Sequence, residues 1–270
     1  MKLNEVNLLV FSPTGSGLNI AKQLTENITE IKTVLLNVTY PRIRAKIKMT
    51  AESDSLTIII FPIYADSLPD IFSHFISKYN FNFTPVILVA GYGNIYTGKA
   101  LNDIQKIISR NNGIVISASN IVFPHSYNNE KIQIEPHRPT PDEIKHINQF
   151  IHNSIQKALN SENLKLSGID LPDGNKRLLS RFPQKFLPHI FIKKPDVDLV
   201  NCNKCKICIN ACPTGAIEDD LKINNSLCIR CLACIKYCKS KARTLVTRTN
   251  LLITTLNKES RMYHKNEFYI

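Results

Sequence analysis

Short apolar runs alternate with longer helix-like stretches through the first 160 residues of the chain. Each run is rich in Val, Ile and Leu, and it is apolar at both alternating positions rather than at every second one. This pattern indicates strands that are covered on both faces, as the strands of a parallel sheet are. The runs that we predict as strands are Val6–Phe11, Thr33–Val38, Leu56–Phe61, Pro85–Ala90 and Gly113–Ala118.

Helices are predicted between and after these strands. The last of them has Thr140 as its N-cap, Pro141 in its first turn, and two acidic residues near the positive end of the helix dipole. Because five strands interleave with crossover helices, we predict a doubly wound α/β domain with a five-stranded parallel sheet. The predicted helices are Ser16–Thr29, Leu68–Lys78, Lys99–Asn111 and Thr140–Ala158.

The chain is expected to divide into four parts. The α/β domain should span residues 1–158, and residues 159–195 are interpreted as a linker, because prolines and turn signals such as "SG" and "PDG" punctuate them. A small second domain is expected at residues 196–243. Residues 244–270 carry no assignment, with strand-like content only in "TLVTRT".

All eight cysteines lie between Cys202 and Cys238, in two copies of one spacing. Each copy reads C-x2-C-x2-C-x3-C, and the second repeats the first at an offset of 26 residues. Three cysteines at three-residue intervals on a tight loop can wrap an iron–sulfur cube, whereas the fourth lies too far along to close the same site. Disulfides would suit a secreted chain, and zinc sites more commonly pair two C-x2-C units across a longer spacer. The spacing therefore predicts two 4Fe-4S clusters.

The cysteine region resembles the bacterial ferredoxins that hold two 4Fe-4S clusters, including the "CPTGAI" that ends the first copy. In those proteins the fourth cysteine of each run ligates the other cluster. The second copy departs from them at Lys239, which stands where the family usually has proline; this removes a φ constraint but no ligand. The resemblance implies one cluster held by Cys202, Cys205, Cys208 and Cys238, and a second held by Cys228, Cys231, Cys234 and Cys212.

Three loops that follow predicted strands are candidates for a ligand site, because ligands of doubly wound sheets bind outside the carboxyl ends of the strands. The first offers hydroxyls and glycines at the start of a helix, which suits an anion, although a helix-capping turn explains that loop as readily. The second and third each place a tyrosine between prolines or glycines. Together the loops predict a pocket for a phosphate tail and a flat heterocycle. The candidate residues are Ser12, Thr14, Gly15, Ser16, Gly17, Tyr64, Ala65, Gly91, Tyr92, Gly93 and Asn94.

These loops resemble those of the flavodoxins, whose FMN loop reads (S/T)-x-T-G-x-T, except that Gly17 replaces the last Thr. Up to about residue 243 the chain resembles flavodoxin–ferredoxin fusion proteins, through "FSPTG", "FPIYADSLP", "GYGN", "HSY", "HRPTPDE" and "LPDGN" in that order. The resemblance implies a flavodoxin-like sheet, a small α+β ferredoxin-like domain with two clusters, and FMN as a further cofactor. Ala65 and Asp66 stand where that family often has glycines, and an inward Asp66 would disfavour the flavin anion. His125 is one more candidate for contact with the flavin.

Positive charge is concentrated in the cysteine-bearing part. The chain has a net charge of +12; residues 1–160 hold 15 basic and 12 acidic side chains, and residues 161–270 hold 19 and 10. That excess suits an acidic redox protein as partner, or simply a solvated surface. The basic run Arg42–Lys48 is interpreted as a solvated face. No secretion signal is visible, and no apolar run approaches the ~20 residues that span a bilayer. We therefore expect a cytoplasmic protein without a membrane span.

These features predict an electron carrier that couples one-electron and two-electron redox partners through two clusters and FMN. The alternative is a flavin-dependent reductase in which the clusters feed FMN to reduce a small molecule, although the sequence has no obvious substrate domain. Binding to nucleic acid is disfavoured, because aromatic residues do not interleave with the basic ones. The pattern carries no prediction of oligomeric state.

Overall fold

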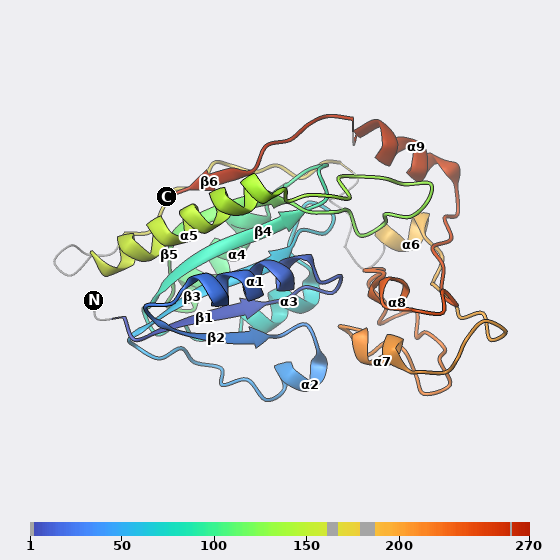
Figure 1. Cartoon of the computed structure of the whole chain (residues 1–270), viewed down its shortest axis with the longest axis horizontal. Helices are drawn as coiled ribbons and strands as arrows, with labels where there is room; N and C mark the ends of the chain where they lie inside the picture. Colours follow the sequence, from blue (N-terminus) through green and yellow to red (C-terminus); the bar gives the residue numbers. More distant parts are fainter. Residues whose placement is uncertain (1–2, 161–166, 179–186, 260) are drawn as a thin grey trace.

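A six-stranded sheet runs through the centre of the molecule, in the order β2-β1-β3-β4-β5-β6 (Figure 1). Its strands are β1 (Glu5–Val10), β2 (Lys32–Asn37), β3 (Ser55–Pro62), β4 (Pro85–Tyr92), β5 (Ile114–Val122) and β6 (Glu267–Tyr269). The first five are parallel, and β6 pairs with β5 in the antiparallel sense. This computed structural model describes residues 3–160, 167–178, 187–259 and 261–270.

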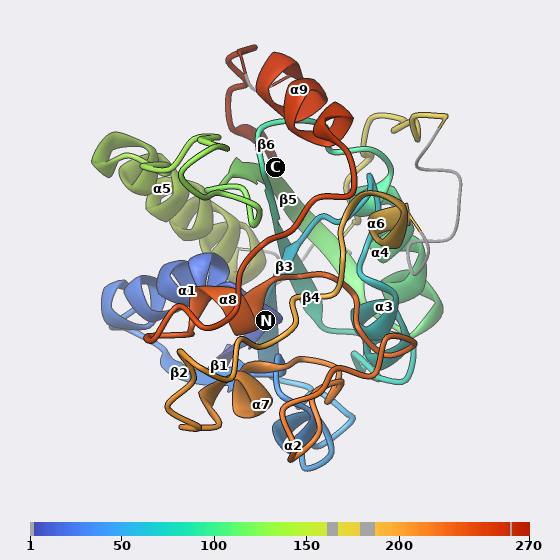
Figure 2. The same cartoon turned by 90° about the vertical axis from the view of Figure 1, so that its right-hand side faces the viewer.

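Helices cover both faces of the sheet. The helices of the described residues are α1 (Ser16–Asn27), α2 (Pro41–Arg44), α3 (Asp70–Ile76), α4 (Ala100–Arg110), α5 (Pro141–Leu159), α6 (Leu187–Phe191), α7 (Ile207–Ala211), α8 (Ala233–Lys236) and α9 (Asn250–Glu259). Helices α1 and α5 lie on one face, and α3 and α4 lie on the other (Figure 2). Among the described residues, none of these helices has the length and apolar character needed to cross a bilayer.

The strands β1, β3, β4 and β5 are buried on both sides, as their sequences predict, whereas the edge strand β2 is only half-buried and begins at an exposed residue. Every residue of β4 is buried, and so is every residue of β3 except Pro62. One core lies under α3 and α4, where the ring of Phe72 stacks on Phe11 and Phe61 at centroid distances of 5.2 and 5.8 Å. The other lies under α1 and α5 and includes Ile20. Burial of these apolar side chains is the main force that holds the helices on the sheet.

The order of the strands reverses at β1, which has β2 on one side and β3 on the other. The predicted doubly wound domain with five parallel strands is therefore confirmed. At such a reversal the loops that follow the strands diverge and leave a crevice for a ligand. Strands β4 and β5 extend beyond their predicted ends, to Tyr92 and Val122. The third candidate loop consequently begins inside a strand.

Residues 244–270, unassigned from the sequence, contribute two elements to this fold. Helix α9 lies beyond the carboxyl ends of the strands, and β6 returns to the edge of the sheet (Figure 1). The register pairs Asn120 with Glu267, and the Phe268 ring packs on Phe150 at 5.2 Å. The strand-like "TLVTRT" forms no strand and makes one isolated bridge, between Thr247 and Ile192. The expected five-stranded sheet thus gains a sixth, antiparallel strand.

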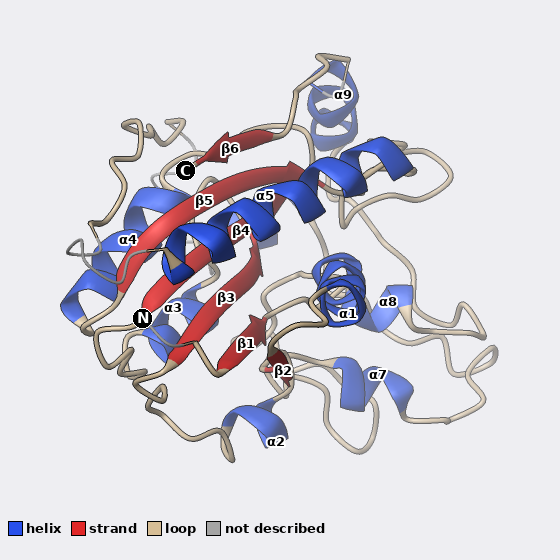
Figure 3. Cartoon of the chain, turned by 60° about the vertical axis from the view of Figure 1, so that its left-hand side comes forward, coloured by secondary structure: helices blue, strands red, loops and turns tan. Residues whose placement is uncertain are grey.

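The predicted linker is only partly a connector. Residues 167–178 run along the α/β domain, where Ile169 N donates to Val115 O at 2.9 Å and Gln105 Nε2 donates to Ile169 O at 2.7 Å. Helix α6 lies at the linker's end. Residues 161–166 and 179–186 lie outside the described residues. The cysteine-bearing domain follows, with α7 and α8 at the carboxyl ends of the strands (Figure 3).

Candidate cofactor site

A cavity of about 540 Å³ lies at the carboxyl ends of β1, β3 and β4. The three candidate loops form one side of it, and α6, the second cysteine loop and α9 form the other. Its size falls within the ~300–1,000 Å³ of ordinary small-molecule and cofactor sites. The α/β domain and the residues from 187 onward, the two halves of the chain, both line the cavity. It therefore forms only when these halves are docked. The residues from the second half include Phe191, Ile192, Ile229, Arg230, Leu252 and Leu256.

The first loop makes the predicted turn into α1. Gly15 has a φ of 90°, in the left-handed region that glycine tolerates. Among the described residues no side chain caps α1, and its first turn holds no acidic residue, so its N–H groups suit an anion. Gly17 packs on β3, because a Cβ there would lie 2.9 Å from Ile60 Cγ2. The close packing of α1 on β3 therefore explains why this chain has a glycine at the position where flavodoxins have Thr.

Tyr237 reaches this loop from the cysteine-bearing domain. A Cβ built on Gly15 would lie 2.8 Å from the Tyr237 hydroxyl oxygen, which places that hydroxyl against the loop. Burial raises the pKa of Tyr237, so its hydroxyl stays protonated and can donate a hydrogen bond. The domain that carries the cysteines thus supplies a hydroxyl beside the loop that lacks one at Gly17.

The second loop turns sharply at its tip. Ala65 and Asp66 both adopt left-handed conformations, with φ of 47° and 61°, at positions where the fusion family often has glycine. Asp66 is buried, and its carboxylate accepts from Arg177 Nη2 at 2.9 Å and from Nε at 3.0 Å. Arg177 therefore neutralises the charge that would disfavour a flavin anion. Tyr64 lines the cavity, and burial raises its pKa well above the usual value, so it is uncharged.

The glycines of the third loop have neighbours that the sequence does not reveal. A Cβ on Gly91 would lie 2.1 Å from Phe123 Cδ2, and one on Gly93 would lie 2.2 Å from His125 Cδ2. The sequence predicts that this loop contributes to a pocket for a flat heterocycle. Side chains that follow β5 already occupy the space beside each glycine, although both glycines still line the cavity.

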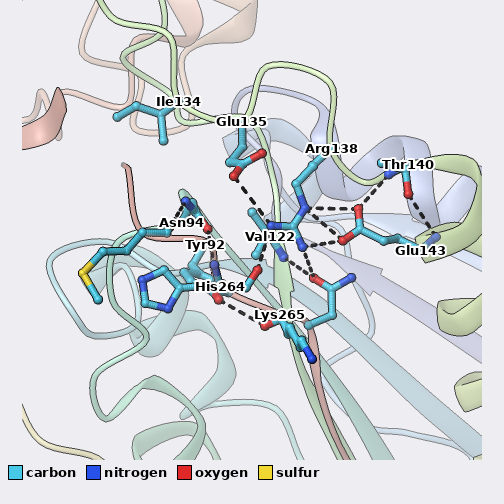
Figure 4. A network of polar contacts seen from close by, with 12 residues as sticks. Tyr92, Asn94, Val122, Ile134, Glu135, Arg138, Thr140, Glu143, His264 and Lys265 are labelled. Carbon is cyan, nitrogen blue, oxygen red and sulfur yellow. Dashed lines mark hydrogen bonds and ion pairs between the residues drawn. The ribbon is translucent and has the colours of Figure 1, made fainter. Parts of the chain in front are cut away.

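Tyr92 and Asn94 contact the carboxy-terminal strap, the name used here for residues 261–270 (Figure 4). Asn94 is fully buried, its Nδ2 donates to Met262 O at 2.9 Å, and its Oδ1 accepts from His264 N at 3.3 Å. The Tyr92 hydroxyl donates to Lys265 O at 3.5 Å. Of these two candidate residues only Tyr92 lines the cavity. The Asn94 amide is instead used to hold the strap.

Arg138 fixes the same strap from the other side (Figure 4). Its Nη1 donates to His264 O at 2.8 Å, and its Nε donates to Glu143 Oε1 at 2.9 Å. Burial opposes both charges, but this pairing outweighs it: the pKa of Arg138 is raised and that of Glu143 is lowered. Glu143 also completes the predicted cap of α5 with Thr140, through bonds in both directions.

His125 lies in the cavity wall as a neutral ring. Its Nδ1 accepts from Tyr127 N at 3.1 Å, and the two rings meet edge to face with centroids 5.0 Å apart. Burial lowers the pKa of His125 to about 4 and raises that of Tyr127. Both side chains line the cavity, so the candidate contact of His125 with a ligand fits its position.

The two cysteine copies fold into matching loops. Lys204 and Lys206 have φ of 55° and 58°, and Arg230 and Leu232, at the same places in the second copy, have φ of 55° and 60°. Left-handed residues at these points turn the chain around a common centre, so that three thiols can face it. Helices α7 and α8 then begin at equivalent positions. The sequence repeat is therefore also a repeat of structure.

The ends of the two copies match as well. Cys212 Sγ lies 3.5 Å from Thr214 Oγ1, and Cys238 Sγ lies 3.6 Å from Ser240 Oγ. The turn after the fourth cysteine is thus kept, although Lys239 replaces proline in the second copy.

The four cysteines that the resemblance assigns to the second cluster are neighbours. Burial raises the pKa of the Cys231 thiol well above its usual value, the Ala233 amide opposes this shift, and the thiols of Cys234, Cys212 and Cys228 add to it. A cluster binds thiolates, so its assembly here must release protons. Among the described residues, no three His, Cys, Asp or Glu side chains stand close enough for a single metal ion. A cube holds its four ligands further apart than one ion does.

The two assigned sets differ in exposure. Three of the four thiols of one set are buried, and Ile229 and Arg230, which lie between two of its cysteines, line the cavity. In the other set Cys205 is exposed and the remaining thiols are half-buried. We call the first, Cys212, Cys228, Cys231 and Cys234, the inner set, and the second, Cys202, Cys205, Cys208 and Cys238, the outer set.

The basic run Arg42–Lys48 belongs to the interface between the two halves and is not only a solvated face. Arg44 Nη2 donates to Pro213 O at 2.6 Å, beside an inner cysteine. The Arg42 guanidinium donates to the Asn210 side chain. Sequence reasoning missed this interface, because each partner lies more than a hundred residues away along the chain.

The structure brings most of the candidate residues to one place. All the predicted cofactor-binding residues except Gly15 and Asn94 line the cavity, and Gly15 shapes the adjoining loop. The sequence analysis gave no role to the side chains of Tyr127, Arg230 and Tyr237. The last two lie inside the second cysteine copy.

Comparisons with known proteins agree with this two-part organisation. Residues 195–218 match the Fer4 family, the 4Fe-4S binding domain. The chain is 33% identical over 84 residues to the aliphatic sulfonate oxidoreductase, polyferredoxin-like subunit, of Pyrococcus furiosus, covering 29% of this chain and 43% of that protein. It is 28% identical over 109 residues to the electron transport protein HydN of Escherichia coli, covering 38% and 62%. The chain thus spans less than two thirds of the length of either relative.

Solved flavodoxin structures are similar to the α/β part. A flavodoxin from the domain Archaea has a TM-score of 0.42 and 9% identity, covering 57% of this chain and 99% of its own. A Fusobacterium nucleatum flavodoxin bound to flavin mononucleotide has a TM-score of 0.39 and 13% identity, covering 56% and 98%. The strand order gives the α/β part a flavodoxin-like parallel sheet, and the matched segment gives the cysteine-bearing part a 4Fe-4S binding domain; this arrangement is similar to that of the flavodoxin–ferredoxin fusions.

Proposed function

We propose that this chain is an electron-transfer protein that holds two 4Fe-4S clusters and one FMN and passes electrons between them. The observation that carries the proposal is the cavity shared by the hydroxyl-rich loop of the α/β domain and the second cysteine loop. Ile229 and Arg230 line it and lie between Cys228 and Cys231, so a ligand there is next to the inner set. Bound FMN supplies both one-electron and two-electron chemistry, whereas each cube exchanges one electron.

The two ends of the cavity suit the two parts of such a ligand. The amides and hydroxyls of residues 12–17, with the Tyr237 hydroxyl, fit a phosphate group. The walls near Tyr64, Tyr92 and His125 are apolar or neutral, as a flat ring requires. A polar group at one end and apolar walls at the other are typical of cofactor sites.

The proposed path runs from an exposed site to a buried one. Cys205 of the outer set is exposed, whereas Cys231 of the inner set is buried beside the cavity. The outer cluster would therefore exchange electrons with a partner protein, and the inner cluster would exchange them with the flavin. Leu252 and Leu256 of α9 also line the cavity, and these apolar side chains help to exclude water from it.

The proposed partner is an acidic redox protein rather than nucleic acid. Exposed lysines surround the outer set, and complementary charge speeds the encounter of redox partners. The names of the two relatives, an electron transport protein and an oxidoreductase subunit, support this class of function. We place the protein in the cytoplasm, since free thiolates persist in reducing surroundings. The exposed lysines are Lys204, Lys206, Lys239 and Lys241.

Cofactor analysis of the anaerobically purified full chain tests this proposal. Iron, sulfide and flavin are quantified per chain, and the visible spectrum is recorded before and after reduction. We expect about eight irons and about one FMN per chain. Zinc in place of iron, or iron without any flavin uptake from added FMN, would contradict the proposal.

A further inference from the structure

Arg230 places a buried positive charge in the wall of the cavity. Its side chain is 2% exposed, its Nη2 donates to Asn225 Oδ1, and its Nε donates to Ile192 O at 3.5 Å. These partners are an amide and a carbonyl, so neither neutralises the guanidinium. Its Nη1 has no hydrogen-bond partner among the described residues. A buried cation with a free N–H is unfavourable unless a ligand supplies an acceptor.

The cysteine loop itself does not require this burial. Lys204 holds the same position in the first copy, with the same φ of 55°, and its side chain is exposed. Both copies therefore place a cation between their first two cysteines, but only Arg230 lines the cavity. The difference between the two copies points to a ligand in the cavity as the reason why Arg230 is buried.

Arg230 lies at the end of the cavity that suits a flat ring. Its positive charge opposes the rise in the pKa of Tyr127, whose ring meets that of His125 at 5.0 Å, and all three side chains line the cavity. The phosphate loop lies elsewhere in the cavity and has Tyr237 over Gly15. The Nη1 group is held in place by the bonds of the other two guanidinium nitrogens.

We propose that Arg230 binds the polar edge of the flavin ring and stabilises its two-electron-reduced, anionic form. This inference rests on the proposed FMN site. Two molecules of a reduced one-electron donor protein each give up one electron through the clusters and are each oxidised once, and water supplies one proton and leaves hydroxide. The neutral ring therefore gains one net negative charge. A fixed guanidinium beside that charge favours the reduced ring over the oxidised one.

The test compares Arg230→Gln with Lys204→Gln in the anaerobically reconstituted full chain. Both variants remove one charge from the same place in the repeat, but only the first changes the cavity. Quenching of flavin fluorescence gives the affinities for FMN and riboflavin, and spectroelectrochemistry gives the two-electron potential of the flavin. We expect Arg230→Gln to bind both oxidised flavins about tenfold more weakly. A further tenfold loss for the reduced flavin would appear as a shift of about 30 mV to more negative potential. Lys204→Gln should match the wild type.

Three results overturn the inference. Arg230→Gln could leave flavin affinity and potential unchanged while altering only the spectrum of the clusters. It could weaken FMN but not riboflavin, which would assign Arg230 to the phosphate. Lys204→Gln could change the affinity and potential of the flavin as much as Arg230→Gln does.

Arg230→Lys is the second variant, for the case in which Arg230→Gln fails to retain iron. The inference requires that Arg230→Lys binds riboflavin more weakly than the wild type does, and equal binding overturns it. A wild-type chain that binds neither flavin would instead refute the proposed function itself.

Discussion

Tyr237 brings a hydroxyl from the cysteine-bearing domain to the phosphate loop of the α/β domain. The loop has lost one hydroxyl at Gly17, and Tyr237 stands over Gly15, two residues before it. A hydrogen bond to a charged phosphate contributes about 1.5–3 kcal/mol, more than a neutral pair does. Docking of the second domain would therefore complete the phosphate site.

We predict that Tyr237→Phe weakens FMN about tenfold and leaves riboflavin, which has no phosphate, unchanged. Fluorescence titration of the full chain with both ligands measures this difference. Tyr79→Phe is the matched control, since Tyr79 is buried in the core against Phe81, whereas the Tyr237 hydroxyl lies against Gly15 of the first loop. Equal losses for FMN and riboflavin would place the Tyr237 hydroxyl away from the phosphate.

The buried imidazole of His125 makes the free energy of unfolding depend on pH. Its pKa falls from an ordinary 6.5 to about 4 in the folded chain because burial disfavours the charged ring. The unfolded chain therefore binds a proton more readily, and stability present above pH 6.5 is lost as pH falls toward 4. We expect the decline of unfolding free energy over this window to be shallower in His125→Asn, whose amide oxygen can still accept from Tyr127 N. Denaturant unfolding at several pH values checks this, and identical slopes would contradict it.

The positions of some single residues could be predicted from the sequence, and the roles of others could not. The placement of Ser12, Thr14 and Tyr64 around one cavity could be predicted because their loops are contiguous and follow strands. The role of Asn94 could not be found, because its partners lie about 170 residues along the chain, in a segment without a motif. The burial of Arg230 could not be predicted either, because the repeat places a cation at the same position in both copies and only one of them is buried.

Helices and strands could be predicted where their sequence pattern was strong. The five parallel strands and the cap of α5 follow from apolar runs and from Thr140 and Glu143. Strand β6 has only three residues, and it forms because the edge of β5 is open to it. Helix α9 follows a stretch with a strand-like sequence. Its position is explained by its side chains that line the cavity and not by local helix propensity.

The strap should depend on the buried pair of Arg138 and Glu143. We predict that Arg138→Gln lowers the unfolding free energy by about 3 kcal/mol, because it leaves a carboxylate buried without its partner. Lys145→Gln, which breaks an exposed pair with Asp142, should change it by less than about 1 kcal/mol. Urea unfolding near pH 7 measures both variants.

The effect of Arg138→Gln should also vary with pH. The pair holds the pKa of Glu143 below its ordinary value of 4.5, so its contribution is present above that pH and is lost as pH falls below it. The difference between wild type and Arg138→Gln should therefore shrink in acid. A loss as small as that of Lys145→Gln at neutral pH would show that the pair does not hold the strap.

At the scale of the whole molecule, the α/β domain and the cysteine-bearing part dock around one shared cavity. Arg44 bridges them, since it donates to Val38 O and Thr39 O in one half and to Pro213 O in the other. The sequence predicted both halves but not their contact, because interface residues such as Arg44 leave no periodic pattern. Only the relative placement of the halves puts the inner set beside the cavity.

Removing this bridge should loosen the docking without unfolding either half. We predict that Arg44→Met increases amide hydrogen exchange at least several-fold in residues 207–217, because three carbonyl groups lose their donor. Lys46→Met is the control, since Lys46 is exposed on the same run. Equal exchange in the two variants would mean that Arg44 does not hold the halves together.

Crystals of the anaerobically reconstituted chain, measured at the iron absorption edge, test the central claim most directly. The account predicts two separate iron clusters, one held by Cys212, Cys228, Cys231 and Cys234 against the cavity, with flavin density in that cavity. Arg230 should lie at the ring, and Tyr237 should lie at the phosphate. A single iron site, or a flavin bound anywhere other than between the two halves, would contradict it.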